Sequence, residues 1–327
     1  MKTSDISYMT LVRRIWQEVL TFIDADYFPE GAQAIREKPD KFEFRRFFPF
    51  LVLHLGCIGV IWTGTSVVAV VTAVVLYVVR MFFVTGFYHR YFCHKSFQAS
   101  RPVQFVFALL GLTAVQRGPL WWAAVHRHHH AHSDEETDIH SPGMQGFLWA
   151  HIGWLTSARN YPTDYSKVRD LAKYPELVFL NRFDLIGPLL LIAALFGFGS
   201  ALGAWAPGLH TSGAQMVIWG FFISTVFVFH GTCSINSVSH VLGSQRYETG
   251  DDSRNSMILA LVTLGEGWHN NHHRYQSSAR QGFYWWEIDI TYWILRSLAA
   301  VGLISALKPI PNSAYGPESA PRQAATH

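Results

Sequence analysis

Residues 269–273 read His-Asn-Asn-His-His, and residues 126–130 repeat the spacing as His-Arg-His-His-His. In both stretches the repeated histidines stand at positions i, i+3 and i+4, which fall on one face of a helix. Neutral imidazole is the commonest side-chain ligand of first-row transition metals and suits iron, copper, nickel and zinc. The two stretches therefore predict two helices, over residues 119–132 and 256–273, that present imidazoles to a metal ion or a metal pair.

Two further histidine groups lie outside these stretches. HRYFCH at residues 89–94 places His89 and His94 at positions i and i+5, which point about 140° apart on an ideal α-helix. We therefore expect this pair at a helix end, or gripping a metal pair from two sides. His240 closes the stretch Asn236-Ser-Val-Ser-His240 and offers one more imidazole.

Other histidines have a plainer interpretation. A lone histidine in an apolar chain is usually a hydrogen-bonded core residue, which is what we expect of His54 and His210. A polyhistidine surface tract would imitate residues 128–130 but would leave the repeat at 272–273 unexplained. The histidines that we expect to be structural, without binding metal themselves, are His128, His132, His140 and His151.

The composition places these histidines in a membrane. Of 327 residues, 50% are hydrophobic and 15% charged, and the N-terminus is too polar for a signal peptide. A net charge of +3 does not favour nucleic acid, and three cysteines without CxxC spacing predict neither disulfides nor an iron–sulfur site. The run 103–115 is too short to cross a bilayer. Four apolar runs do approach that length: residues 47–64, 67–88, 184–205 and 214–236.

The connections between these spans predict their orientation. The turns at 63–66 and 206–213 contain no Lys or Arg, so the positive-inside rule places them away from the cytoplasm. Both termini and the histidines then share the cytoplasmic side, as in a bacterial inner membrane protein. We predict an all-α integral membrane protein with four transmembrane helices in two hairpins and a cytoplasmic helical cap holding a histidine-rich di-iron site. Its predicted parts are an N-terminal cytoplasmic amphipathic segment, a membrane domain and a polar tail: residues 1–46, 47–305 and 306–327.

Longer stretches carry a resemblance to a known family. They are HRYFCH (89–94), GPLWWAAVHRHHHAHSDEETDIHSP (118–142), FLWAHIGWL (147–155), INSVSH (235–240), ETGDDSRN (248–255) and LGEGWHNNHHRYQSSARQGFYWWEIDIT (264–291). Over residues 47–305 the chain strongly resembles the membrane fatty-acid Δ9 desaturases, the stearoyl-CoA desaturase-like and bacterial acyl-lipid group. The resemblance implies an O₂-dependent enzyme that introduces a cis Δ9 double bond into a saturated acyl chain.

The resemblance also assigns roles to residues. It implies that two irons are bound by nine histidines, with Asn236 joining through a bound water: His89, His94, His126, His129, His130, His240, His269, His272 and His273. It further implies a set of substrate contacts, in which the first three residues bend the acyl chain and the last two close its tunnel: Gln116, Trp122, Thr232, Tyr77 and Met81. Because metal-bound histidines usually need a partner for their second nitrogen, we expect Glu266, Asp134 and Asp138 to orient imidazole N–H groups.

The chemistry explains why such a site is needed. No acid or base can remove hydrogen from an unactivated methylene, whereas an oxidant made from O₂ on reduced iron can. Two electrons per turnover must come from outside. The sequence contains no haem-binding HPGG motif or flavin fingerprint, so we expect a separate donor: a ferredoxin, a rubredoxin, or cytochrome b5 with its reductase.

Two other functions stay open at this point. A histidine-box hydroxylase or ketolase of alkane, sterol or carotenoid would insert oxygen into its substrate. A non-catalytic metal-binding membrane protein would consume no O₂. The match at Gln116, Trp122 and Thr232 favours desaturation over both.

One departure from the sequence pattern of acyl-CoA desaturases bears on which molecule carries the acyl chain. Acyl-CoA desaturases of the resembling group place an Arg-Asp pair just before the second histidine stretch, where it contacts the CoA headgroup. Here Ala124 and Val125 occupy these positions, and neither can pair with phosphate. Arg117 and Arg159 retain basic charge nearby. We therefore favour a glycerolipid-linked substrate over acyl-CoA, with these two arginines as the phosphate contacts if CoA is bound.

Overall fold

The computed structural model describes residues 3–316, and the regular structure of these residues is almost entirely helical, which confirms the all-α prediction. The longer helices are α1 (Thr3–Ile23), α3 (Phe44–Gly56), α5 (Val67–Phe82), η2 (Phe83–Cys93), α6 (Arg101–Leu112), α7 (Pro119–Ala131), α11 (Pro175–Arg182), α12 (Ile186–Trp205), α14 (Ser224–Ser237) and α17 (Ile290–Ala300). Short α-helices connect them: α2 (Ala32–Arg36), α4 (Val60–Thr63), α8 (Pro142–Gln145), α9 (Phe147–His151), α10 (Arg169–Ala172), α13 (Gly213–Val217), α15 (Met257–Val262) and α16 (His269–Arg274).

Tighter and wider turns complete the chain. Two elements, η2 and η7 (Ile218–Ile223), are π-helical. The 3₁₀ turns are η1 (Cys57–Gly59), η3 (Gly153–Thr156), η4 (Ala158–Asn160), η5 (Tyr165–Lys167), η6 (Pro207–Leu209), η8 (Val238–His240) and η9 (Asn312–Tyr315). One antiparallel ribbon pairs β1 (Gln98–Ala99) with β2 (Ile304–Ser305), with Gln98 opposite Ser305.

Four continuous helical runs are long and apolar enough to cross a membrane, which fits an integral membrane protein. Each overlaps one predicted span, and the second and fourth continue past the predicted ends: Phe44–Thr63, Val67–Cys93, Ile186–Trp205 and Gly213–His240. The extension of the second run carries His89 and ends next to His94, and that of the fourth ends at His240. The apolar helix α6 has only 12 residues, in keeping with its predicted failure to span.

The turns between consecutive long helices are tied to each other. Ser66 caps α5 by accepting a hydrogen bond from the Ala69 backbone N–H, and it donates to Gln215 Oε1 at 2.7 Å. The Gln215 amide in turn donates to the Thr63 carbonyl at 2.9 Å. Capping satisfies N–H groups at a helix start that would otherwise lack partners. Here the same contacts also hold two distant turns together.

Arg80 is fully buried within α5, where an unpaired charge would be costly. Its guanidinium donates to the Thr225 hydroxyl at 2.7 Å, to the Thr113 carbonyl at 3.1 Å and to the Ser224 hydroxyl. These partners come from α14 and from the end of α6. Arg80 therefore joins three elements through hydrogen bonds.

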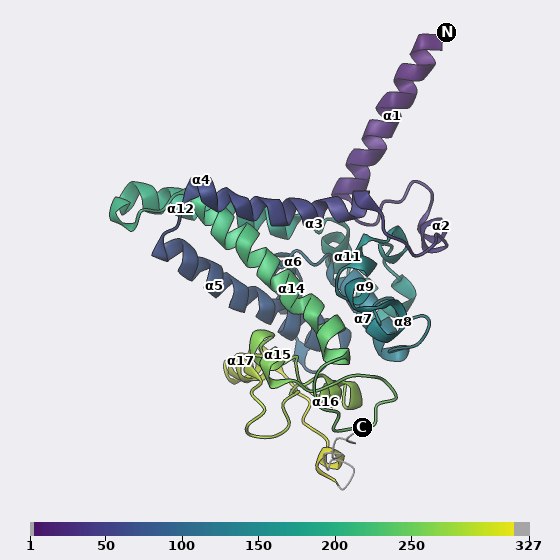
Figure 1. Cartoon of the computed structure of the whole chain (residues 1–327), viewed down its shortest axis with the longest axis vertical. Helices are drawn as coiled ribbons and strands as arrows, with labels where there is room; N and C mark the ends of the chain where they lie inside the picture. Colours follow the sequence, from purple (N-terminus) through teal and green to yellow (C-terminus); the bar gives the residue numbers. More distant parts are fainter. Residues whose placement is uncertain (1–2, 317–327) are drawn as a thin grey trace.

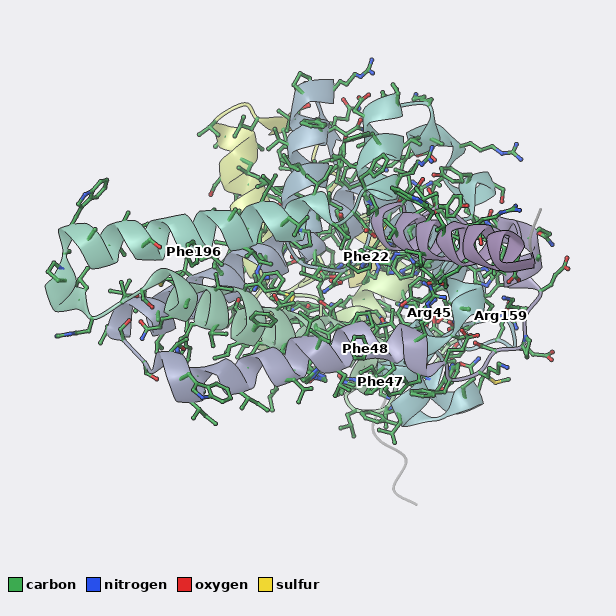
Figure 2. The ribbon with its side chains drawn as sticks, turned by 90° about the horizontal axis from the view of Figure 1, so that it is seen from above. Phe22, Arg45, Phe47, Phe48, Arg159 and Phe196 are labelled. Atoms are coloured by element: carbon green, nitrogen blue, oxygen red, sulfur yellow. The ribbon has the colours of Figure 1, made fainter. Side chains whose placement is uncertain are left out.

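The histidine-bearing elements gather at one end of the long helices, on both sides of the inner ends of α5 and α14 (Figure 1). Helix α1 projects away from the rest of the chain (Figure 1), joined to the start of α3 by an ion pair between Glu18 and Arg45. Figure 2 shows Phe22, Arg45 and Phe48 at this junction. The Phe22 side chain is 69% exposed and that of Phe48 53% exposed, so apolar surface continues from α3 onto α1.

Close helix packing yields a test of the fold. A methyl group on Gly199 of α12 would lie 2.5 Å from the Ser212 carbonyl and 2.6 Å from Met216, whereas one on Gly197 would meet nothing within 4 Å. Because backbone cannot move aside cheaply, Gly199→Ala should destabilise the protein by about 1–3 kcal/mol. Gly197→Ala is the matched control and should not lower the midpoint of thermal unfolding in detergent. Equal midpoints for the two variants would contradict this packing.

Candidate metal centre

Nine histidines converge in two neighbouring groups near the C-terminal ends of α5 and α14. In each group one nitrogen per residue lies within 4.8 Å of those of the others. They are the nine that the sequence resemblance named. The larger group contains His89, His94, His126, His130 and His272, and the smaller contains His129, His240, His269 and His273.

His89 and His94 reach the same group because the helix that carries them is π-helical. Element η2 follows α5 without a break, and its wider turn brings positions i and i+5 onto one side. The two rings lie 4.8 Å apart between centroids. The expectation of a helix end is confirmed, because η2 ends at Cys93 and His94 is its C-cap. The alternative, a grip on a metal pair from two sides, was wrong, since it assumed ordinary α-helical winding.

The histidine stretch at residues 269–273 also differs locally from its prediction. We predicted a single helix over residues 256–273, but the helix is broken between α15 and α16. Leu264 and Gly265 have φ of 57° and 125°, and a Cβ on Gly265 would lie 2.5 Å from Asp289. The break lets α16 begin at His269, so that His269, His272 and His273 occupy its first turns.

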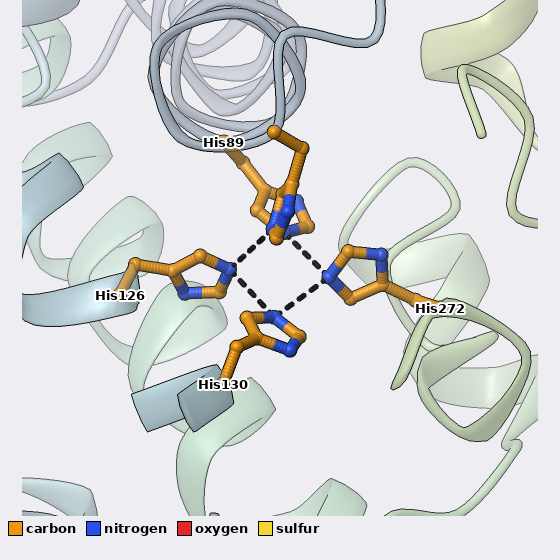
Figure 3. A group of neighbouring side chains, drawn as sticks. His89, His126, His130 and His272 are labelled. Carbon is orange, nitrogen blue, oxygen red and sulfur yellow. Dashed lines mark hydrogen bonds between the residues drawn. The ribbon is translucent and has the colours of Figure 1, made fainter. Parts of the chain in front are cut away.

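The spacing of the inward nitrogens tests whether a metal would fit (Figure 3). The Nε2 atom of His130 lies 2.9 Å from those of His126 and His272, and His272 Nε2 lies 2.9 Å from His89 Nε2. Nitrogens at adjacent right-angled positions are this far apart when each is about 2.0–2.1 Å from a shared ion, the usual metal–imidazole distance. A neutral imidazole has one proton, so these contacts cannot all be hydrogen bonds. The group fits a metal ion.

Carboxylates hold the outward nitrogens of four of the histidines. His89 Nδ1 lies 2.5 Å from Glu266, His129 Nδ1 2.9 Å from Asp138, His240 Nδ1 2.8 Å from Asp134 and His273 Nδ1 2.7 Å from Asp251. A carboxylate that accepts from Nδ1–H leaves Nε2 unprotonated and aimed inward. Such a partner was expected for Glu266, Asp134 and Asp138. The role of Asp251 was missed, although it lies in the quoted stretch ETGDDSRN.

The electrostatics keep the imidazoles neutral. Burial, followed by the neighbouring imidazoles, lowers the pKa of His94, His126, His130, His269 and His272 well below the usual value. Metal binding requires unprotonated imidazole, so these rings are ready to bind near neutral pH. Within the described residues, the buried Nε2 of His273 has no hydrogen-bond partner, as expected of a nitrogen that awaits an ion.

The carboxylates are correspondingly ionised. Burial alone would raise the pKa of Asp134, but its hydrogen bond and charge interaction with His240 outweigh burial and lower it to about 2. The pKa values of Asp138 and Asp251 are lowered further below the usual range by their imidazole partners, again against burial. Glu266 also pairs with the buried Arg90, which in turn contacts Asp289. The surroundings of the histidines therefore form a connected set of charges.

The remaining histidines lie outside the two groups. His128 contacts the Thr137 carbonyl, and His132 contacts the exposed Glu135. His140 lies 3.3 Å from Asp138, the carboxylate that holds His129, and burial lowers its pKa to about 3. His140 also forms a third, smaller group with His129 and Asp138, whose ligand atoms lie within 4.8 Å of one another. His151 belongs to a separate chain of contacts described below.

A largely apolar cavity of about 690 Å³ leads to the histidines. Gln116, Trp122 and Thr232 meet on its wall. The Gln116 amide donates to the Thr232 hydroxyl at 2.7 Å, and the Trp122 indole donates to Gln116 Oε1 at 3.3 Å. A smaller cavity of about 330 Å³ continues past Trp122 and Thr232 to His89. Asn236 lines both cavities.

The structure places the other four predicted substrate contacts farther from the histidines. Met81 is fully buried, and the Tyr77 hydroxyl donates to the Val262 carbonyl at 2.5 Å; neither residue lines the two cavities. Arg117 lines the larger cavity, but its guanidinium already donates to the Ala25 and Tyr161 carbonyls. Arg159 is exposed and lines a separate surface pocket with Ala124 and Val125.

Comparison with known proteins places this geometry in a family. The model of the family described as fatty acid desaturase matches residues 65–304. The chain belongs to the fatty acid desaturase family. The resemblance seen in the sequence is thereby confirmed, and the protein is an oxidoreductase whose histidine clusters can bind metal.

Its relatives differ in the position at which they act. An acyl-CoA 5-desaturase of Anemone leveillei is 34% identical over 86% of this chain and 88% of its own length. An sn-1 stearoyl-lipid 9-desaturase of Anabaena variabilis is 36% identical over 79% of this chain and 91% of its own. Delta-9 acyl-lipid desaturase 1 of Arabidopsis thaliana is 35% identical, covering 80% and 82%. Both carriers and more than one position occur among them.

The carboxylate contacts yield a test of the metal centre. Asp251→Asn keeps the size of the side chain but removes the charge that fixes His273, so metal affinity should fall about 10–100-fold. Glu135→Gln removes an exposed carboxylate from His132, outside both groups, and should leave affinity unchanged. Competition titrations with a chelator would measure both. Equal affinities in the two variants would exclude a role for Asp251 in metal binding.

Proposed function

We propose that the protein introduces a cis double bond, at Δ9, into saturated fatty-acyl chains, using O₂ and two irons. The nine histidines hold the irons, with Asn236 joining through a bound water. The observation that carries this proposal is the pair of histidine groups at the end of an apolar cavity, in a chain of the fatty acid desaturase family. Relatives named as 9-desaturases support Δ9, and the 5-desaturases among them make the position a question for experiment.

The residues divide the work of the reaction. Iron bound by these imidazoles would supply the O₂-derived oxidant that an unactivated methylene requires. Glu266, Asp134, Asp138 and Asp251 fix the ring orientations, which protein-bound metals usually need. The cavity wall excludes water from the reacting carbons and positions them, which converts binding energy into rate. The hydrogen-bonded contact between Gln116 and Thr232 sets the bend of the acyl chain. Tyr77 and Met81 line neither cavity, so their proposed role at the far end of the chain rests on the resemblance to the family alone.

The proposal also covers the orientation of the protein in the membrane and the source of its electrons. The four long helices cross the membrane as two hairpins, with both termini and the histidines in a cap on the cytoplasmic side of a bacterial inner membrane. The turns tied by Ser66 and Gln215 then lie on the opposite side. Electrons arrive from a separate ferredoxin, rubredoxin, or cytochrome b5 with its reductase.

Alanine substitutions test the metal ligands. His129→Ala and His272→Ala each remove one nitrogen from one group, so the new monounsaturated acid should disappear from lipids of an expressing bacterium. His132→Ala should retain activity, because the His132 side chain hydrogen-bonds to Glu135, which lies outside both groups. Gas chromatography with mass spectrometry of the lipids would measure the product and the double-bond position. Activity in His129→Ala, or a hydroxylated product, would contradict the proposal.

The acyl carrier is the second question, and we propose a glycerolipid-linked chain. Ala124 and Val125 offer no charge to CoA, and the guanidinium of Arg117 is already engaged by two carbonyls. Arg159 is exposed in the neighbouring pocket, which Arg36 and Lys167 also line, and is open to a phosphate there.

Two labelled substrates separate the alternatives. Membranes that contain the protein should desaturate labelled phosphatidylcholine directly, and labelled stearoyl-CoA only after its acyl chain has entered lipid. With lipid remodelling blocked, label in unsaturated phosphatidylcholine is therefore the expected product. Rapid desaturation of the thioester alone would overturn the preference and leave Arg159 and Arg117 as phosphate contacts.

A further inference from the structure

A second set of histidines, separate from the nine, forms a continuous chain between three helices. His54 of α3, His230 of α14 and His151 of α9 are each half-buried. His54 Nε2 lies 3.0 Å from His230 Nε2, and His230 Nδ1 lies 3.0 Å from His151 Nε2. His54 was expected to be a lone core histidine and His151 a structural one, and neither stretch signalled the contact through His230.

These three rings are arranged in a line and do not converge on a common point, as the ligands of a metal site would. In both metal groups each histidine offers one nitrogen to a common point. Here His230 uses both of its nitrogens, one towards each neighbour, so the three rings cannot share a single ion. A linear set of imidazoles joined through both nitrogens is instead suited to passing a proton, since each ring can accept at one nitrogen and release at the other.

The groups at the two ends of this line of histidines determine how many protons the line holds. His54 Nδ1 lies 2.6 Å from the Phe50 carbonyl, which can only accept. At the other end His151 Nδ1 lies 2.8 Å from the Ser237 hydroxyl, which donates to the Cys233 carbonyl at 3.0 Å. Acceptors therefore close both ends of a path with five links. Three neutral imidazoles and one hydroxyl bring only four protons. All links are satisfied when the chain carries one proton more.

The charge of that proton has no carboxylate to compensate it. The elements that carry or adjoin the three histidines, α3, α9, η3 and α14, contain no Asp or Glu. The cations of α3 are Arg45, paired with Glu18, and Arg46, stacked on Tyr161. Helix α5, which packs against α14, adds Tyr77 and the cation Arg80, and α14 itself carries the Cys233 thiol. Burial lowers the pKa of His151. Hydrogen bonding thus favours the extra proton and burial opposes it, a balance that suits uptake and release.

The path runs beside the larger cavity. Phe50, Phe229, Cys233 and Asn236 line that cavity and are helix neighbours of the histidines or of Ser237. Ser237 immediately precedes the last turn before His240. Ionisable groups at membrane depth commonly mark proton paths, because an idle charge there would be costly.

We propose that His54, His230 and His151 form a proton relay that holds one excess proton and supplies the metal centre. The supply role rests on the proposed function. Desaturation removes two hydrogens from the acyl chain and reduces O₂ to two waters, which consumes two electrons from the external donor and two protons from solution. The cavity wall is largely apolar. Protons can pass along this line of imidazoles as far as Ser237, where release towards the metal centre requires the hydroxyl to turn away from the Cys233 carbonyl.

The first experiment detects the proton itself, in zinc-loaded protein that cannot turn over. Nitrogen NMR of ¹⁵N-histidine-labelled protein at neutral pH should contain the signal of one doubly protonated imidazole. His230→Gln should remove this signal, since an amide takes up no proton. His210→Asn is the control, because His210 lies in an exposed turn at a φ of 49° that Asn tolerates, and it should leave the signal intact. Three neutral rings in the wild type would overturn the proposal.

The second experiment tests supply, in iron-loaded membranes. His54→Gln and His230→Gln should slow desaturation about tenfold and enlarge the solvent deuterium isotope effect, with iron content unchanged. His210→Asn should match the wild type in all three measurements. A doubly protonated imidazole together with unchanged turnover and isotope effect in His230→Gln would overturn the supply role. If wild-type protein desaturates nothing, the proposed function fails, and the NMR signal alone then decides whether the proton-holding chain exists.

Discussion

The dominant constraint on this structure is the mutual repulsion of inward-facing imidazole lone pairs. The Nε2 atom of His130 lies 2.9 Å from those of His126 and His272, and the Nε2 atoms of His240 and His269 lie 3.1 Å apart. Unprotonated nitrogens at such distances repel unless a cation lies between them. The rest of the chain brings these rings together from four elements and holds them there until an ion compensates the repulsion.

The long helices deliver the imidazoles by running past the apolar spans. The second and fourth end in a π-helix and a 3₁₀ turn, η2 and η8, which bring His89 and His240 towards the cap histidines. At the opposite end, the contact of Ser66 with Gln215 ties the two turns, and Arg80 joins α5 to α14 between them. Helix α5 is thus fixed to α13 at its start and to α14 near its C-terminal end, which restricts how far His89 and His240 can move apart.

Sequence reasoning identified the parts of this site whose signal is local. The i, i+3, i+4 spacing at residues 126–130 and the length of the apolar runs need no knowledge of the fold. The π-helical winding at His89 could not be predicted, because it depends on packing and leaves no residue signature. The break at Leu264 was missed for a related reason, since a non-glycine residue with positive φ gives no warning in the sequence. Asp251 and His230 were overlooked because their partners lie far along the chain.

The four carboxylates behind the histidines have a consequence for charge balance. Glu266, Asp134, Asp138 and Asp251 bring four negative charges to a shell of neutral imidazoles, and two divalent ions would bring four positive ones. The loaded centre is then close to electroneutral, apart from the ion pairing of Arg90 with Glu266 and Asp289. A neutral assembly is inexpensive to hold beside a membrane, where a net charge would be costly. The ligands are uncharged, yet the protein supplies the counterions one layer farther out.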